Sequence, residues 1–213
     1  MTPAVSEPTV SRPRALLRTV SALVAAGALV GAVWGLLAPP IRGVVALTRS
    51  GDRVKAALGS EADHWFTAAA LFCGMLCVLA VVAAVWAWQW RAHRGPAMTA
   101  ALSVGAVGAA VAAAGTGALV ARWRYGAVDV ATAPVSEDRR VHYIIEAPAV
   151  FFGHTPWQIA LTLLLPAAVI AGVYVLAAVS TPRDDLGAWP PVDYPRVLTD
   201  RIATEADVPP VVP

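Results

Sequence analysis

A stretch of twenty residues without an ionisable side chain, Thr19 to Ala38, most constrains what this chain can fold into. As an α-helix rising ~1.5 Å per residue, it would cross roughly the ~30 Å hydrocarbon core of a lipid bilayer. Arg14 and Arg18 precede it, and the Pro39-Pro40 pair that follows cannot continue a helix. The run is longer than the ~7–15 apolar residues of a secretory signal peptide, so it predicts a retained transmembrane helix over 19–38.

Three further apolar stretches have a similar length and contain no Asp, Glu, Lys, Arg or His: 65–90, 99–121 and 157–180. The seven-residue connection 91–97 is short enough to return the third stretch antiparallel beside the second. Thr155 and Gln158 have the spacing of a capping box at the start of the fourth stretch, and Pro166 predicts a kink within it. We therefore predict an all-α fold, a bundle of four transmembrane helices in up-down-up-down order.

The remaining segments are predicted to be tails and loops. Residues 1–15 and 183–213 are rich in proline and polar side chains, which predicts disordered tails around a transmembrane domain over 16–182. Residues 41–64 are predicted to form a mixed-charge loop, with the next helix beginning near Glu61. In the long loop 122–156, the apolar run 141–145 fits either a short strand or a segment lying in the membrane interface.

Composition supports a membrane protein and excludes one class of partner. The chain is 58% hydrophobic and only 14% charged, which leaves too little polar surface for an ordinary soluble domain. The formal net charge of +2, without a basic run interleaved with aromatic residues, argues against nucleic-acid binding. The partner that the composition does predict is the lipid bilayer.

Small residues recur at every fourth position in two of the predicted helices, where they leave a shallow groove along one helix face. Close approach of two such faces brings the helices into extensive van der Waals contact. We therefore predict that the first and third helices pack against each other through these rows. The predicted packing residues are Gly27, Gly31 and Gly35 in the first helix, and Gly105, Ala109, Ala113 and Gly117 in the third.

Orientation depends on where the basic residues stand, because their totals on the two sides are equal. Arg14 and Arg18 directly precede the first span, and Arg91 and Arg94 lie in the seven-residue connection. The positive-inside rule then predicts a plasma-membrane protein with both termini in the cytoplasm. The tryptophans fit two interfacial belts and support four spans in either direction: Trp65, Trp123 and Trp157 in one belt, and Trp86, Trp88 and Trp90 in the other.

The absence of charged residues and histidine from the spans argues against two functional classes. Proton-coupled transporters need an ionisable relay within the membrane, and membrane-embedded haem needs histidine ligands there. His64, His142 and His154 lie in two loops without a tight ligand spacing, although Glu61, Asp63 and Glu146 are near them in sequence. We therefore predict no catalytic, cofactor-binding or metal-binding residue.

Cys73 and Cys77 are the only cysteines, and they invite a redox interpretation because some four-helix membrane oxidoreductases use a cysteine pair. Their spacing is C-x-x-x-C on one helix face, and a thiolate is disfavoured in hydrocarbon. Packing within the helix interface is the simpler interpretation. Similarly, the proline-rich segment 189–195 fits a spacer better than a docking peptide.

The residues 34–40, WGLLAPP, together with the acidic entry 61–65 to the second span and the four-span plan, resemble an actinobacterial family of uncharacterised integral membrane proteins. The resemblance covers about residues 15–182. It implies the four-helix architecture and a cell-membrane location, and it supplies no catalytic residue.

Together these features favour a non-enzymatic membrane protein that works by packing against a partner. The main hypothesis is a scaffold or accessory subunit of a cell-envelope membrane assembly, bound to another membrane protein or to copies of itself. The alternative is a small channel-like permease, for which a hydrated central path would be the sign. A more remote alternative is a thiol/quinone oxidoreductase that uses Cys73 and Cys77.

Overall fold

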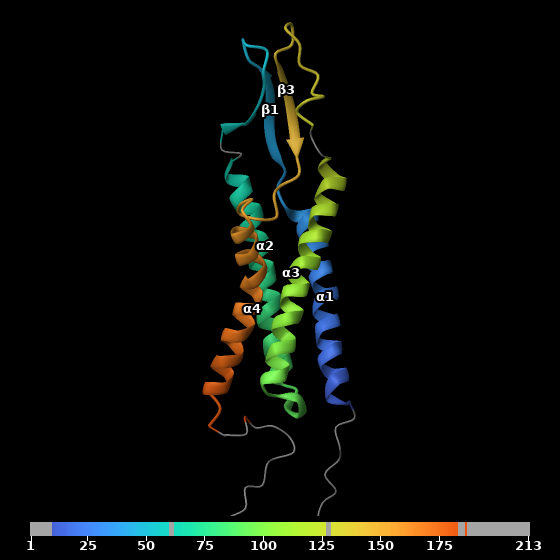
Figure 1. Cartoon of the computed structure of the whole chain (residues 1–213), viewed down its shortest axis with the longest axis vertical. Coiled ribbons are helices and arrows are strands. Elements are labelled where there is room, and N and C mark those ends of the chain that lie inside the picture. Colours follow the sequence, from blue (N-terminus) through green and yellow to red (C-terminus); the bar gives the residue numbers. More distant parts are fainter. Residues whose placement is uncertain (1–9, 60–61, 127–128, 183–185, 187–213) are drawn as a thin grey trace, which may run out of the picture.

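The computed structural model describes residues 10–59, 62–126, 129–182 and 186. Four long helices form an elongated bundle, and a small β-sheet stands on one end of it (Figure 1). The helices are α1 (Arg12–Leu37), α2 (Ala62–Trp88), α3 (Pro96–Tyr125) and α4 (Pro156–Val179). Each is long and apolar enough to cross a membrane, which confirms the predicted bundle of four membrane-spanning helices. We call the end that carries the sheet the sheet end, and the opposite end the far end.

The helices differ from the predicted spans mainly at their ends. α1 begins at Arg12, so residues 12–15 are helical rather than part of a disordered tail. Pro13 is suited to the first turn because its missing N–H would have no helical partner there. Residues 1–9, 187–213 and the predicted start of α2 at Glu61 lie outside the described residues.

Local sequence signals explain two connections. A single 3₁₀ turn, η2 (Arg91–His93), joins α2 to α3 within the short predicted connection. At the start of α4, the Thr155 hydroxyl accepts a hydrogen bond from the Gln158 amide, and the Gln158 side chain accepts one from the Thr155 amide. The predicted capping box is therefore confirmed. Pro166 lies inside α4, where it is buried.

The sheet corrects the expectation that residues 41–64 form only a loop. This region contains β1 (Ile41–Leu47) and β2 (Arg53–Ala57), and β3 (Val141–Glu146) completes an antiparallel sheet in the order β2-β1-β3. The apolar run 141–145 is thus a strand, one of its two predicted forms. The alternation of apolar and polar residues that is typical of a strand was not recognisable in residues 41–64, because charged residues interrupt it. Arg42 in β1 is exposed, and Lys55 in β2 forms an ion pair.

The interior of the bundle is filled by two clusters of buried side chains. One lies toward the sheet end and includes Trp34, Phe72 and Ala113. The other lies toward the far end and includes Met98, Ile170 and Tyr174. Among the described elements, α1 packs most extensively on α3, while α4 packs on both α2 and α3.

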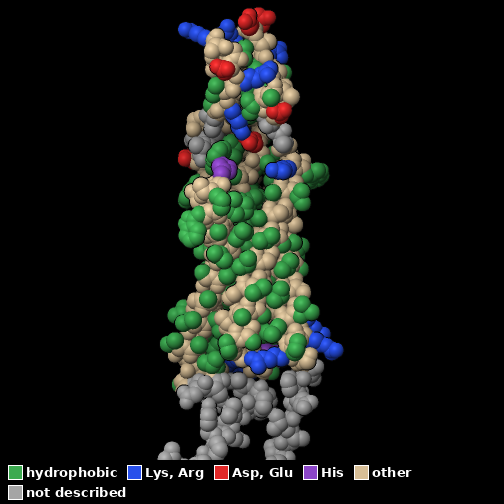
Figure 2. Space-filling model, viewed as in Figure 1, with side chains coloured by type: hydrophobic (Ala, Val, Ile, Leu, Met, Phe, Trp, Pro, Cys, Tyr) green, Lys and Arg blue, Asp and Glu red, His purple; other side chains and the backbone are tan. Residues whose placement is uncertain are grey.

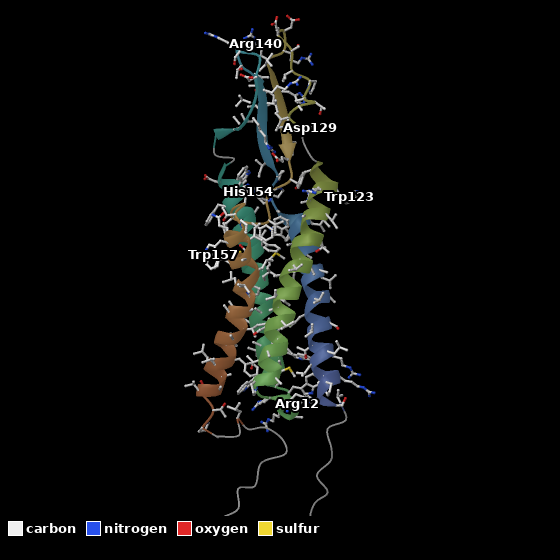
Figure 3. All side chains as sticks on the ribbon, viewed as in Figure 1. Arg12, Trp123, Asp129, Arg140, His154 and Trp157 are labelled. Carbon is white, nitrogen blue, oxygen red and sulfur yellow. The ribbon has the colours of Figure 1, made fainter. Side chains whose placement is uncertain are left out.

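The outer surface has the pattern expected of a membrane-spanning bundle. Figure 2 shows hydrophobic side chains along the length of the helices, with charged side chains gathered at the two ends. Trp123 and Trp157 lie near the sheet end of the helices (Figure 3), and they are 84% and 70% exposed. Exposed tryptophans at that level fit the predicted interfacial belt.

Candidate functional site

The structure places the two rows of small residues against each other. Gly27 faces the backbone of Ala109, and Gly31 faces that of Ala113. At both glycines a Cβ atom would overlap with the facing backbone, so the helices are closer here than any side chain would allow. The Thr116 hydroxyl also donates a hydrogen bond of 2.9 Å to the Ala28 carbonyl oxygen across this contact.

The remaining predicted packing residues continue the same contact. At Gly35 a Cβ would come 2.8 Å from that of Val120, and Gly117 lies under the Trp34 ring. At the other end, Gly105 meets Leu23 and the backbone of Val20. The contact therefore extends along most of the length of α1 and α3, and β1 follows directly after α1.

Sequence reasoning missed Trp34 as the residue that joins this pair to α2. Its side chain is fully buried, and its Nε1 donates a hydrogen bond of 2.8 Å to the Ala68 carbonyl oxygen. The Phe72 ring packs edge-on against it, with ring centroids 5.6 Å apart. No signal in the sequence marked this role, because Trp34 lies four residues before the end of its predicted span, just as Trp86 does.

The sheet has one covered face and one open face. Val45 and Ile144 are buried on the covered face by Ala133 and Val135 of the preceding loop. Residues paired directly across antiparallel strands share a face, so the register places Val44 and Ala46 together with their partners on the other side. We define the open face as these residues: Arg42, Val44, Ala46, Val54, Ala56, Val141, Tyr143 and Ile145.

The open face is apolar and accessible. Tyr143 is 72% exposed and Ile145 52%, with Val54 and Val141 close to half exposed. Seven of its eight defining residues are uncharged, although charged side chains gather at the sheet end (Figure 2). A contiguous apolar patch therefore lies among charged side chains at the sheet end.

The polar residues that were candidates for chemistry do not converge. No group of three or more metal-ligating side chains occurs among the residues that the structure describes. His64 lies 3.3 Å from the Pro40 carbonyl oxygen, and Glu146 forms an ion pair with Lys55. Cys73 and Cys77 are free thiols, partly buried, on α2.

Cavities lie at the ends and side of the bundle. A cavity of about 500 Å³ lies where the sheet meets α3, beside Lys55, Arg122 and His154. An apolar groove of about 680 Å³ runs along α2 beside Val30 of α1. A smaller cavity of about 280 Å³ lies at the far end between α2 and α4. In the middle of the described bundle, the space between Leu76, Ala109 and Ile170 has no room for a water molecule.

Comparison with known proteins gives a family without an assigned activity. The family described as a protein of unknown function, DUF2567, matches residues 23–188. The uncharacterised protein Rv1591 of Mycobacterium tuberculosis is 54% identical over 172 residues, which cover 80% of this chain and 89% of the relative. The uncharacterised protein ML1222 of Mycobacterium leprae is 47% identical over 176 residues, or 83% of this chain and 89% of that protein. No solved structure matches. With the match spanning all four helices from the middle of α1 onward, this chain belongs to the DUF2567 family.

Proposed function

We propose that this protein is a non-enzymatic accessory subunit of a cell-envelope membrane assembly, and that its open sheet face contacts another integral membrane protein. The observation that carries the proposal is the apolar character of that face outside the helix bundle. β1 follows α1 closely and rises along the long axis of the molecule (Figure 1). With seven residues at ~3.4 Å each, it reaches well beyond the headgroup layer, so lipid cannot cover the face.

The size of the open face favours a partner that is itself anchored in the membrane. Three strands ~4.8 Å apart and about five residues long present only about 240 Å². A stable contact between soluble proteins buries about 800 Å² on each partner. Two proteins in one membrane are already concentrated relative to each other, and exposed helix faces can extend their contact into the bilayer. The open face is therefore suited to a membrane-embedded partner.

The closed centre of the bundle supports an accessory role over the permease alternative. A permeation path needs a hydrated route between the helices, yet the middle of the described bundle is filled by Leu23, Leu76 and Ile170. The described parts of the helices also place no acidic, basic or histidine side chain in that central space. An assembly subunit needs only the packed bundle as an anchor.

A photo-crosslinking amino acid in place of Tyr143 should test the partner directly in native membranes. We expect a discrete adduct with one integral membrane protein, and loss of that adduct when Ile145 is also replaced by glutamate. Both side chains are exposed, so the changes should leave folding intact. The matched control is the same crosslinker at Ala131, in an exposed loop position beside the covered face.

Two outcomes would contradict the proposal. Equal adducts from positions 143 and 131 would show that contact is non-specific. An adduct of this chain with itself would replace the accessory role by self-assembly.

We also propose that the protein lies in the plasma membrane with its far end and both termini in the cytoplasm. Arg14, Arg18, Arg91 and Arg94 gather at the far end, as the positive-inside rule requires of a cytoplasmic side. A reporter that is active only outside the cytoplasm should be silent after Pro213 and active when inserted in the 122–156 loop. The reverse pattern would invert the topology and place the open face in the cytoplasm.

A further inference from the structure

The cavity at the far end lies where α2 and α4 end, at the level of the short turn η2. Its wall combines polar and apolar side chains, with the polar ones toward the helix ends. The polar part of the wall comes from Trp88, Gln89, Arg91, Arg94 and Tyr174. Val85 and Val173 belong to its apolar part.

The described charged side chains that line this cavity are all positive. Arg91 and Arg94 both line it, and no acidic residue does among those that the structure describes. His93 is adjacent in sequence and buried, and burial, together with the nearby Arg12 charge, lowers its pKa below the ordinary histidine value. Among the described residues, the charge of the cavity wall therefore comes from the two guanidinium groups.

Arg94 is held in place before any ligand arrives. Its Nε donates a hydrogen bond of 2.7 Å to the Trp88 carbonyl oxygen, and one Nη donates another of 2.7 Å to the Leu186 carbonyl oxygen. Its guanidinium also lies over the Trp88 ring, 4.5 Å from the ring centroid. A fixed cation loses little conformational entropy when it binds an anion.

Tyr174 supplies a second, independent sign of a ligand. Its side chain is only 4% exposed, and its ring packs edge-on against Trp88, with centroids 5.0 Å apart. The enclosed hydroxyl oxygen lies beside Arg94 and within reach of the Gly95 backbone amide, but no contact with the described residues has the geometry of a full hydrogen bond. A buried hydroxyl without a partner costs free energy, which an oxygen atom in the cavity would recover.

We propose that this cavity binds the phosphate group of an anionic phospholipid from the adjoining leaflet. Arg91, Arg94 and the Tyr174 hydroxyl are donors of the kind that phosphate oxygens accept. Val85 is 49% exposed, so the apolar end of the cavity adjoins the hydrocarbon, where the acyl chains of the same molecule would lie. A phospholipid would contact both the polar and the apolar end of the cavity, whereas a soluble phosphate would contact only the polar end. Because the cavity lies at the far end, lipid binding there does not depend on a partner at the open face.

Native mass spectrometry of the full chain in detergent would test the assignment with three probes: phosphatidylglycerol, phosphatidylcholine and glycerol 3-phosphate. We expect phosphatidylglycerol to bind more tightly than phosphatidylcholine, and glycerol 3-phosphate to bind only weakly. Tyr174→Phe and Arg91→Gln should each weaken phosphatidylglycerol binding by about tenfold, the effect of removing one hydrogen bond to a charged group. Arg14→Gln, which removes an exposed charge at the same end, should leave binding unchanged.

Each alternative result would overturn a defined part of the inference. If Arg14→Gln and Arg91→Gln weakened phosphatidylglycerol binding equally, the binding would depend on the overall surface charge of the far end and not on this cavity. Equal affinity for glycerol 3-phosphate would make the ligand a soluble phosphate instead of a lipid. Unchanged binding in Tyr174→Phe, whose fold should persist because only a hydroxyl is removed, would exclude this cavity as the site.

Discussion

Replacing Gly31 by alanine is expected to destabilise the bundle by ~1–3 kcal/mol, the range for overpacking a well-packed interior. The added Cβ would overlap with the Ala113 backbone and with the Thr116 hydroxyl. Backbone atoms cannot rotate away, so α1 and α3 would have to separate along their shared contact. Alanine favours a helix over glycine by ~1 kcal/mol, so a net loss of stability would show that packing dominates.

Thermal unfolding of the full chain in detergent would measure this effect, with Gly115→Ala as its matched control. Gly115 lies on α3 as well, but a Cβ there meets no atom within 4 Å. The control should therefore unfold at the same temperature as the unchanged protein, or slightly higher. Gly31→Leu should be worse than Gly31→Ala. Equal behaviour of Gly31→Ala and Gly115→Ala would contradict the close contact between α1 and α3.

The number of helices and the small-residue rows could be predicted because each is written locally in the sequence. An uncharged run of twenty residues has few alternatives to a membrane span, and a row of glycines at spacing four marks a face that lipid would fill poorly. Gly27 and Ala109 could therefore be predicted as helix-packing residues from the sequence alone. The capping box at Thr155 was readable for the same reason, since its two partners are three residues apart.

The sheet and the far-end cavity depend on pairs that are distant in sequence. β1 pairs with β3, which lies about a hundred residues later in the chain. The charges of Arg42 in β1 and Lys55 in β2 made residues 41–64 resemble a loop. Arg94 and Tyr174 lie on separate elements, and each by itself is an ordinary interfacial residue. Only the packing of α2 against α4 brings them to one cavity.

Trp34 shows the same limit in a single side chain. Within an apolar span, a tryptophan that faces lipid and one that faces a neighbouring helix have the same sequence context. Its hydrogen-bond acceptor, the Ala68 carbonyl oxygen, belongs to a different helix. The structure thus shows that Trp34 joins α1 to α2, which the pattern of apolar residues alone did not indicate.

Trp34→Ala is accordingly expected to cost ~3–5 kcal/mol, as for large aromatic side chains removed from packed interiors. The change would leave a cavity between α1, α2 and α3, and would remove the edge-on contact with Phe72. Trp34→Phe keeps most of the ring volume and loses the hydrogen bond to Ala68, a contribution of ~0.6 kcal/mol on average within membranes. The alanine variant should therefore be much the less stable of the two.

The same unfolding measurement applied to Trp123→Ala provides the control, because that tryptophan is 84% exposed at the end of the helices. Its removal should change the free energy of unfolding by no more than about 0.5 kcal/mol, as for other exposed positions. If Trp34→Ala and Trp123→Ala lowered stability equally, Trp34 would be an interfacial residue and not the anchor between α1 and α2. The expected combination, a large loss for Trp34→Ala and a small one for Trp34→Phe, would assign most of the contribution of Trp34 to packing.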